Sequence, residues 1–216
     1  RLLSTRQAST VGVVGAGNMG RGMAASLARA DIRVEQFDVS AKSLAESVAQ
    51  LDGRITPAAS LSALCESSDT IVVSVAGEKA ERAVFLGPGG LFESAAPGSL
   101  LVGCGTITVD FARELHDAAS ARKLRFLDAP VSGGPEGAAK GTLSIMVGGE
   151  AAAFDDAKPV LEGMGAYIVR MGPAGAGAAA KLINQLLTAT NAHAATEALA
   201  LARAMGMDSP ETLAPL

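Results

Sequence analysis

Three polar side chains share one face of an apolar helical stretch near the C-terminal end of the sequence. Lys181 lies three and four positions before Asn184 and Gln185, the spacing that puts side chains on the same side of a helix. Burial lowers the pKa of a lysine, whose ammonium can then exchange a proton with a substrate oxygen. A lone lysine at a helix start is also often a solvated surface residue, so the spacing by itself leaves both interpretations open.

A second candidate site is a glycine-rich segment after the β-branched run 11–14. In this G-x-G-x-x-G pattern the first glycine allows a tight turn, the second lets the backbone approach a pyrophosphate, and the third lets the following helix pack closely. The free N–H groups at the start of that helix would bind the phosphates. The motif consists of Gly15, Ala16, Gly17, Asn18, Met19 and Gly20.

Asp38 strengthens the dinucleotide interpretation. It ends the second expected strand at the distance from the motif where a carboxylate accepts hydrogen bonds from the adenosine ribose. A carboxylate there repels a 2′-phosphate, and Val39 and Ser40 follow without a neighbouring arginine. The sequence therefore predicts NAD as the cofactor, with NADP as the alternative.

A third candidate is the segment 128–134, which reads DAPVSGG and follows another expected strand. In open α/β sheets, ligands bind at the carboxyl ends of the strands. Ser132, Gly133 and Gly134 can offer a hydroxyl and a nest of backbone N–H groups to a carboxylate. A plain turn with a helix cap fits the same residues equally well.

The elements that must position these groups alternate between strands and helices. Short β-branched runs predict strands at 11–14, 33–37, 70–75, 99–102, 125–127, 143–147 and 167–170. Segments between them predict helices at 19–30, 41–50, 78–85 and 109–121. The sequence therefore predicts an α/β fold with a Rossmann-type, doubly wound and mostly parallel sheet.

We expect three regions along the chain. Residues 1–9 are disordered or a targeting remnant, 10–174 form the Rossmann domain, and 175–216 form a linking helix and the start of a helical C-terminal domain that is incomplete here. The helix is expected over 178–205, with Gly206 as its C-cap. The N-terminal residues contain Arg and Ser but no acid, which predicts a mitochondrial or plastid matrix location if they are a transit remnant, and a cytoplasmic one otherwise.

Composition argues against several classes of protein. Of the 216 residues, 49% are hydrophobic and 19% charged, which excludes a disordered chain. The net charge of −4 disfavours nucleic-acid binding, and no apolar stretch reaches the roughly 18 residues of a membrane helix. Two cysteines and two histidines, widely spaced, predict no metal site.

Taken together, the motifs resemble the β-hydroxyacid dehydrogenase family, which includes relatives of 3-hydroxyisobutyrate dehydrogenase, tartronate semialdehyde reductase, L-threonate dehydrogenase and 6-phosphogluconate dehydrogenase. Four signatures stand in family order, at 15–20, 103–107, 128–149 and 175–185. The resemblance implies an NAD-binding domain and a helical C-terminal domain that closes the active site and forms a homodimer or tetramer. It also implies a small carboxylate-bearing substrate.

The resemblance implies roles for particular residues. Lys181 matches the catalytic lysine, which accepts or donates the proton of the reacting oxygen. Thr106 would lie beside the nicotinamide, and Ala76 and Gly77 match a cofactor-contacting pair. The positions that would bind the substrate are Ser132, Gly133, Gly134, Asn184 and Gln185.

Three residues depart from the family pattern. Gly105 stands where relatives have a serine that helps to hold the substrate. Gly77 replaces a proline, and Gln185 replaces the second asparagine of the commoner pair. Because of these departures, the resemblance does not identify which hydroxy acid is the substrate.

The function expected from the sequence is NAD-dependent hydride transfer to or from a small 3-hydroxy acid or its semialdehyde. Candidate substrates are of the 3-hydroxyisobutyrate, glycerate or tartronate semialdehyde, and threonate type. The alternative is a non-catalytic dinucleotide-binding module of the same family, which Lys181 argues against and Gly105 leaves open. Imine reduction ranks last, because relatives with that activity usually replace the lysine.

Overall fold

The computed structural model describes residues 10–51, 53–207 and 209, which fall into two compact units. The first unit ends at Lys181 and the second begins at Leu182. The expectation of a disordered or targeting segment at 1–9 lies outside the described residues.

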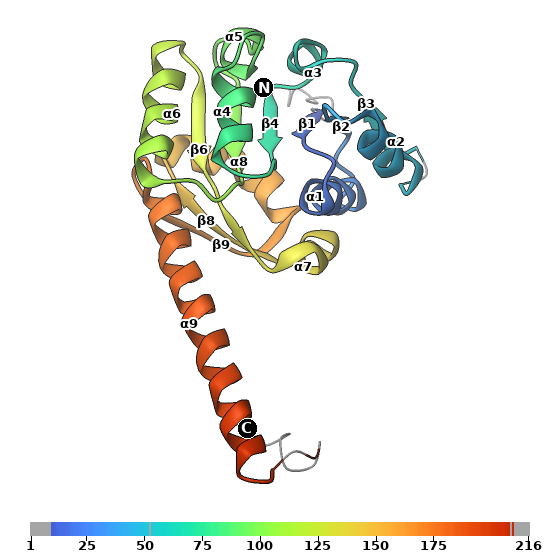
Figure 1. The fold of residues 1–216 in the computed structure, drawn as a ribbon. Helices are drawn as coiled ribbons and strands as arrows, with labels where there is room; N and C mark the ends of the chain where they lie inside the picture. The colour runs from blue at the N-terminus through green and yellow to red at the C-terminus, as the bar shows by residue number, and fades with distance from the viewer. Residues whose placement is uncertain (1–9, 52, 208, 210–216) are drawn as a thin grey trace, which may run out of the picture. The chain divides into compact units, whose positions relative to one another are not determined.

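Strands and helices alternate through the first unit (Figure 1). The strands are β1 (Val11–Val14), β2 (Val34–Phe37), β3 (Ile55–Pro57), β4 (Thr70–Val73), β5 (Leu100–Gly103), β6 (Arg125–Asp128), β7 (Val131–Ser132), β8 (Leu143–Gly148) and β9 (Gly165–Gly172). The helices are α1 (Asn18–Arg29), α2 (Ala41–Ala49), α3 (Leu61–Ser67), α4 (Glu78–Leu86), α5 (Leu91–Ser94), α6 (Val109–Ala121), α7 (Gly134–Lys140), α8 (Ala151–Glu162) and α9 (Ala176–Ala204).

Within the described residues the strands form one nine-stranded sheet in the order β3-β2-β1-β4-β5-β6-β8-β7, with β9 paired to β8. The strands from β3 to β6 pair in parallel, as do β8 and β9. This confirms the predicted α/β fold with a mostly parallel sheet. Strand β8 runs antiparallel to both β6 and β7, so the parallel crossover pattern stops after β6.

Several elements do not appear in the sequence prediction. Strand β3 is three residues long and ends in Pro57, and β7 has two residues, so neither shows a β periodicity. Helix α7 begins directly at Gly134, where the sequence suggested an anion-binding nest or a turn with a helix cap and no helix was predicted. A proline in the first turn of a helix costs nothing, because its missing N–H has no intrahelical partner there.

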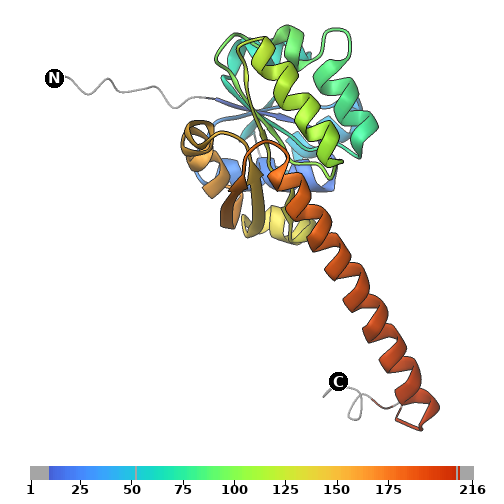
Figure 2. The same ribbon diagram turned by 90° about the vertical axis from the view of Figure 1, so that its left-hand side faces the viewer.

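Helices cover both faces of the sheet, and each face has its own apolar core (Figures 1 and 2). On one face α1 and α8 pack through Met23, Leu27 and Leu161. On the other face α3 to α6 pack through side chains that include Phe85 and Leu115. Because both faces of the central strands are buried, these strands read as continuous apolar runs.

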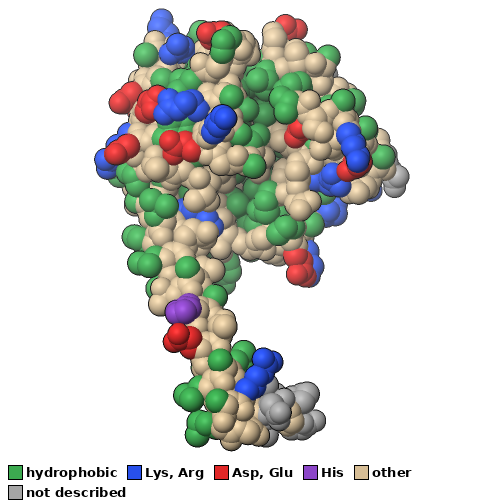
Figure 3. All heavy atoms as spheres, in the orientation of Figure 1, with side chains coloured by type: hydrophobic (Ala, Val, Ile, Leu, Met, Phe, Trp, Pro, Cys, Tyr) green, Lys and Arg blue, Asp and Glu red, His purple; other side chains and the backbone are tan. Residues whose placement is uncertain are grey.

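The second unit consists of the rest of α9 and the residues after it. Helix α9 ends at Ala204, close to Gly206, whose φ of +84° suits the predicted C-cap. Large apolar side chains remain exposed along it, among the green spheres of Figure 3. They are Leu182, Ile183, Leu186, Leu187, Leu199 and Leu201. Among the described helices, none is long and apolar enough to cross a membrane.

Candidate active site

The glycine loop between β1 and α1 is held by close backbone contacts at its two ends. Gly15 has φ +107°, and a Cβ there would lie 2.1 Å from the carbonyl oxygen of Ser74. A Cβ on Gly20 would lie 2.2 Å from the carbonyl oxygen of Gly15. At Gly17, by contrast, a Cβ would meet nothing within 4 Å. The first and third glycines are thus fixed by packing, whereas the second faces open space that a ligand can approach.

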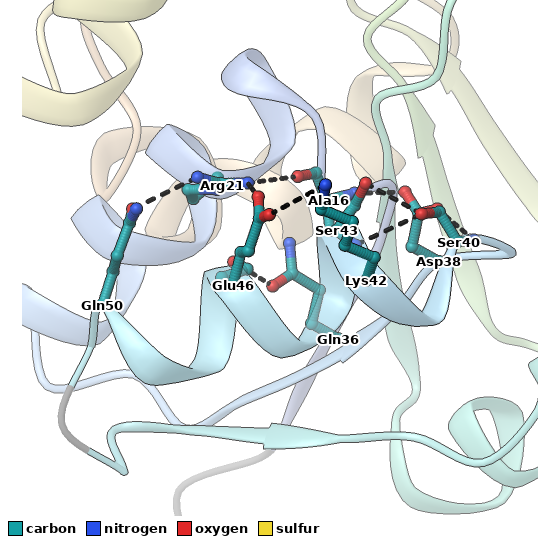
Figure 4. Close-up of polar contacts among 10 residues, drawn as sticks. Ala16, Arg21, Gln36, Asp38, Ser40, Lys42, Ser43, Glu46 and Gln50 are labelled. Atoms are coloured by element: carbon teal, nitrogen blue, oxygen red, sulfur yellow. Dashed lines mark hydrogen bonds and ion pairs between the residues drawn. The ribbon is translucent and has the colours of Figure 1, made fainter.

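The Asp38 carboxylate fastens this loop to the end of β2 (Figure 4). Oδ2 accepts a hydrogen bond of 2.6 Å from the N–H of Ala16, and Oδ1 accepts one of 2.7 Å from the N–H of Ser40. A carboxylate has about four acceptor sites, so two bonds to the backbone leave capacity for ribose hydroxyls. Asp38 therefore shapes the loop as well as facing the predicted cofactor site.

The buried side chain of Gln36, which the sequence analysis did not single out, also supports the glycine loop. Gln36, labelled in Figure 4, extends from β2. Its side chain donates a hydrogen bond of 2.8 Å to the carbonyl oxygen of Gly15 and accepts one of 2.7 Å from Ser47 Oγ. The signal in the sequence is its position two residues after Val34, on the same buried face of β2. Gln36 satisfies a carbonyl group that the tight turn would otherwise leave unpaired.

A cavity of about 410 Å³ opens beside the glycine loop. It joins the ends of β1, β2 and β4, where parallel strands direct their carboxyl ends to one edge of the sheet. Four of the predicted cofactor residues line it: Gly15, Gly17, Asp38 and Ala76. Ala16 is a buried residue of the loop itself. Asn18, Met19 and Gly20 are the first residues of α1.

The loops after β4 and β5 are tied together through the first residue of α4. Glu78 Oε2 accepts hydrogen bonds of 3.0 Å and 2.8 Å from the N–H and Oγ1 of Thr108. Gly77 precedes Glu78 and has φ +82°, which proline cannot adopt because its ring fixes φ near −65°. A proline at this position would therefore require a different turn. Thr106 is exposed on the second of these loops.

The predicted substrate loop begins in β7 and runs into α7. Ser132 is half-buried and pairs with Ser144 of β8. Gly133 and Gly134 have φ values of +132° and +64°, so two consecutive residues adopt conformations that favour glycine. Helix α7 packs closely against α1, because a Cβ on Gly22 would lie 2.8 Å from the N–H nitrogen of Ala139. The substrate loop and the glycine loop are therefore supported by one pair of helices.

A buried carboxylate that the sequence reading did not single out holds the start of α9. Asp128 is fully buried at the end of β6. Its Oδ1 lies 2.8 Å from His116 Nε2 and accepts a hydrogen bond of 3.0 Å from Gly175 N–H, and its Oδ2 accepts one of 2.8 Å from Ala178 N–H. The first N–H groups of a helix have no intrahelical partner, and this carboxylate supplies one.

Lys181 lies one turn beyond Ala178 on α9 and is the last residue of the first unit. Only 7% of its surface is exposed. Burial lowers the pKa of its ammonium, which is the change that proton exchange near neutral pH requires. Asn184 and Gln185 follow along the same helix in the second unit, so their place at the site stays a prediction.

A second buried carboxyl, on α4, was also missed. Glu81 is completely buried, and within the described part of the chain neither of its oxygens accepts a hydrogen bond of standard geometry, although the Gly105 N–H lies nearby. Burial raises the pKa of Glu81 from 4.5 to about 7; the nearby Gly105 N–H lowers it in part, and the Glu78 carboxylate raises it. Burial and the Glu81 charge also raise the pKa of the Cys104 thiol.

Two family models match this chain. Residues 10–172 match the family model described as the NAD binding domain of 6-phosphogluconate dehydrogenase, and residues 175–214 match that described as the NAD-binding of NADP-dependent 3-hydroxyisobutyrate dehydrogenase. The chain belongs to the β-hydroxyacid dehydrogenase family. Residues 10–172 accordingly form an NAD(P)-binding domain.

Individual relatives are similar over most of this chain. A 3-hydroxyisobutyrate dehydrogenase of Pseudomonas aeruginosa is 40% identical over 92% of this chain and 65% of its own length. An NAD-dependent L-serine dehydrogenase of the same organism is 37% identical over 92% of this chain and 66% of its own. The solved structure of Mycobacterium tuberculosis 3-hydroxyisobutyrate dehydrogenase with L-serine is 34% identical, with a TM-score of 0.85 over 96% of this chain and 69% of that one. The chain thus spans about two thirds of the length of these relatives.

We expect Asp128→Ala to destabilise the fold strongly, because it leaves two buried N–H groups and His116 without their acceptor. The cost is about 3 kcal/mol, which lowers the melting temperature by roughly 6–12 °C in a domain of this size. Asp128→Asn keeps one acceptor oxygen and is expected to lose less. Thermal unfolding followed by circular dichroism measures both.

Asp156→Ala is the control, since this carboxylate is exposed and pairs with Arg125 at the surface. It is expected to change stability by less than about 1 kcal/mol. An Asp128→Ala protein as stable as Asp156→Ala would contradict the role assigned to Asp128.

The raised pKa of Glu81 predicts a pH dependence of stability. Between pH 4.5 and about 7 the folded protein holds a proton on Glu81 that the unfolded chain has lost. Stability therefore falls as the pH rises through this interval and levels off above it. Glu81→Gln cannot ionise, so its melting temperature relative to the parent is expected to rise between pH 5 and pH 8, whereas the exposed Glu162→Gln shows no such trend.

Proposed function

We propose that this chain is the cofactor-binding part of an NAD-dependent dehydrogenase that acts on a small 3-hydroxy acid or its semialdehyde. The observation that carries the proposal is Lys181, buried and with a lowered pKa on the helix that Asp128 fastens to the sheet. The relatives named for dehydrogenation of 3-hydroxyisobutyrate and L-serine support the substrate class. Substrates of the 3-hydroxyisobutyrate, glycerate or tartronate semialdehyde, and threonate type fit it.

The cavity beside the glycine loop fits a dinucleotide. Gly17 leaves open space for a pyrophosphate at the start of α1, and Asp38 lies at the cavity wall with spare acceptor capacity for a ribose. Ala76 also lines the cavity, and Gly77 and Thr106, on the loops after β4 and β5, are assigned to the same cofactor. A nicotinamide dinucleotide bound there would take up the hydride in oxidation and supply it in reduction.

The substrate carboxylate is assigned to Ser132, Gly133 and Gly134. Successive backbone N–H groups in left-handed conformations form a concave nest for an anion, and the serine hydroxyl adds a donor. Asn184 and Gln185 are assigned to the other substrate oxygens. These contacts would hold the reacting carbon in a fixed orientation, which accounts for a large share of the rate in such reactions.

Lys181 is the general acid and base of the proposed reaction. In oxidation its neutral amine accepts the hydroxyl proton as the carbonyl forms, and in reduction its ammonium returns that proton to the oxygen. Because burial lowers its pKa, a larger fraction is neutral near physiological pH than for a solvated lysine. The lysine can then work in both directions.

We expect Lys181→Ala to lower kcat about 10²- to 10⁴-fold in the full-length protein while the Kd for NADH changes less than about twofold, because the lysine acts on the reacting oxygen. NADH formation from 3-hydroxyisobutyrate, D- and L-glycerate, L-threonate, 4-hydroxybutyrate and L-serine measures turnover. In the parent protein, kcat/KM for oxidation rises with pH to a plateau, with a midpoint below the ordinary pKa of lysine. The exposed Lys158→Ala is the control.

Undiminished turnover by Lys181→Ala would show that another group moves the proton. Silence of the parent protein toward the whole panel, together with tight NADH binding, would favour the non-catalytic dinucleotide-binding module instead.

Asp38→Asn is expected to bind NADPH roughly tenfold more tightly than the parent protein, because it removes the charge that repels a 2′-phosphate. The amide oxygen can still accept a hydrogen bond from Ala16 N–H, so the glycine loop keeps its shape. Fluorescence titration with NADH and NADPH gives both affinities, and the exposed Asp69→Asn serves as the control. A parent protein that already prefers NADPH would show that this interpretation of Asp38 is wrong.

A further inference from the structure

Two carboxyl groups on the first turns of α4 contact the loop that follows β5. Glu78 accepts two hydrogen bonds from Thr108, at the far end of the loop. Glu81, one turn further along the helix, is completely buried and lies against Gly105 in the middle of the loop. Between these two contacts lies Thr106, the residue assigned to the nicotinamide. The loop is therefore supported by a neighbouring helix on both sides of its functional residue.

The Glu81 carboxyl occupies the space that a side chain at position 105 would need. A Cβ on Gly105 would lie 1.9 Å from Glu81 Oε1 and 2.8 Å from its Cδ. A Cβ on Gly103 would lie 3.8 Å from Oε2 of the same carboxyl and 3.0 Å from Cζ of Phe126. Both glycines therefore border the space in which this carboxyl is enclosed.

The backbone does not itself require glycine at position 105. Gly105 is outside the left-handed region, so other residues could adopt its conformation without strain. The three atoms nearest a Cβ at this position all belong to Glu81, so a larger residue would have to displace its enclosed carboxyl. This is also the position where the family resemblance leads us to expect a serine. The buried Glu81 carboxyl thus occupies the space that a serine side chain at position 105 would take.

We propose that Glu81 is a positioning residue, whose carboxyl fills the place of a side chain at position 105 and holds the 103–107 loop in the conformation that presents Thr106. Its link to catalysis rests on the proposed function, whereas its packing against Gly105 does not. The loop is supported from α4 by Glu81 rather than from within by a serine. Cys104 on the loop and Glu78 on α4 are the other titratable groups with a charge interaction at Glu81.

A double-mutant cycle in the full-length protein tests this inference. Gly105→Ser displaces the carboxyl from its enclosed space, and we expect a lower melting temperature and at least a tenfold loss of kcat/KM for the hydroxy acid. Glu81→Ala leaves the loop without support and is expected to raise the substrate KM by a similar factor, while the Kd for NADH changes less than about threefold. In Glu81→Ala/Gly105→Ser the serine enters the emptied space, so both melting temperature and kcat/KM recover above those of either single variant.

Two controls separate positioning from general damage. Glu81→Gln keeps the shape of the carboxyl and is expected to retain kcat/KM within about threefold of the parent. Lys79→Ala, on an exposed position of the same helix, is not expected to rescue Gly105→Ser. Rescue by Glu81→Ala and not by Lys79→Ala identifies the contact itself.

The inference is overturned if Gly105→Ser is as stable and active as the parent, or if the effects of Glu81→Ala and Gly105→Ser simply add. The cycle in melting temperature needs no substrate. If the parent protein turns over no hydroxy acid, a sign reversal of the Gly105→Ser effect on melting temperature still supports the packing of Glu81 against position 105, and only the proposed reaction fails.

Discussion

The hydrogen bonds around the Asp128 carboxylate fix where α9 begins relative to the end of β6. One buried side chain binds His116 of α6 and two N–H groups at the start of the helix that carries Lys181. The space around it is closed, because a Cβ on Gly148 would lie 2.5 Å from Oδ1 and a Cβ on Gly177 would lie 2.2 Å from the Asp128 carbonyl oxygen. Burying a charge is costly unless donors surround it. Because Asp128 at the end of β6 binds the first N–H groups of α9, it also positions the Lys181 backbone one turn further along that helix.

Carboxylates also bind backbone N–H groups at other points along the carboxyl edge of the sheet. The loops after β1, β4, β5 and β6 share the carboxyl ends of neighbouring parallel strands, so their separation is set by the sheet itself. Carboxylates then fix three backbone segments along this edge: Asp38 holds the glycine loop, Glu78 holds the loop after β5, and Asp128 holds the start of α9. Rigid elements thus supply the distances, and single carboxylates supply the loop conformations.

The sequence predicted the parts of this arrangement that depend on local pattern. Continuous apolar runs indicated the central parallel strands, and the glycine motif with Asp38 indicated a dinucleotide site, because both follow from residue type and spacing. It did not indicate α7, since Gly-Pro in a first helical turn also suits a loop. It predicted the strand β8 but not that β8 runs antiparallel to β6 and β7. It also missed Gln36, Glu81 and Asp128. Nothing local distinguishes a buried carboxyl from a surface one, because the donors that surround Asp128 lie far along the chain.

Glu81 and Gly105 show why departures from a family motif need a spatial explanation. Taken alone, the glycine at position 105 reads as a lost hydroxyl and therefore as weakened function. In the structure the space is filled from α4 by a carboxyl that is buried without a hydrogen bond of standard geometry within the described residues. A group so placed costs free energy unless its volume or its charge contributes elsewhere. The glycine on the loop and the buried acid beside it are then two aspects of one packing arrangement.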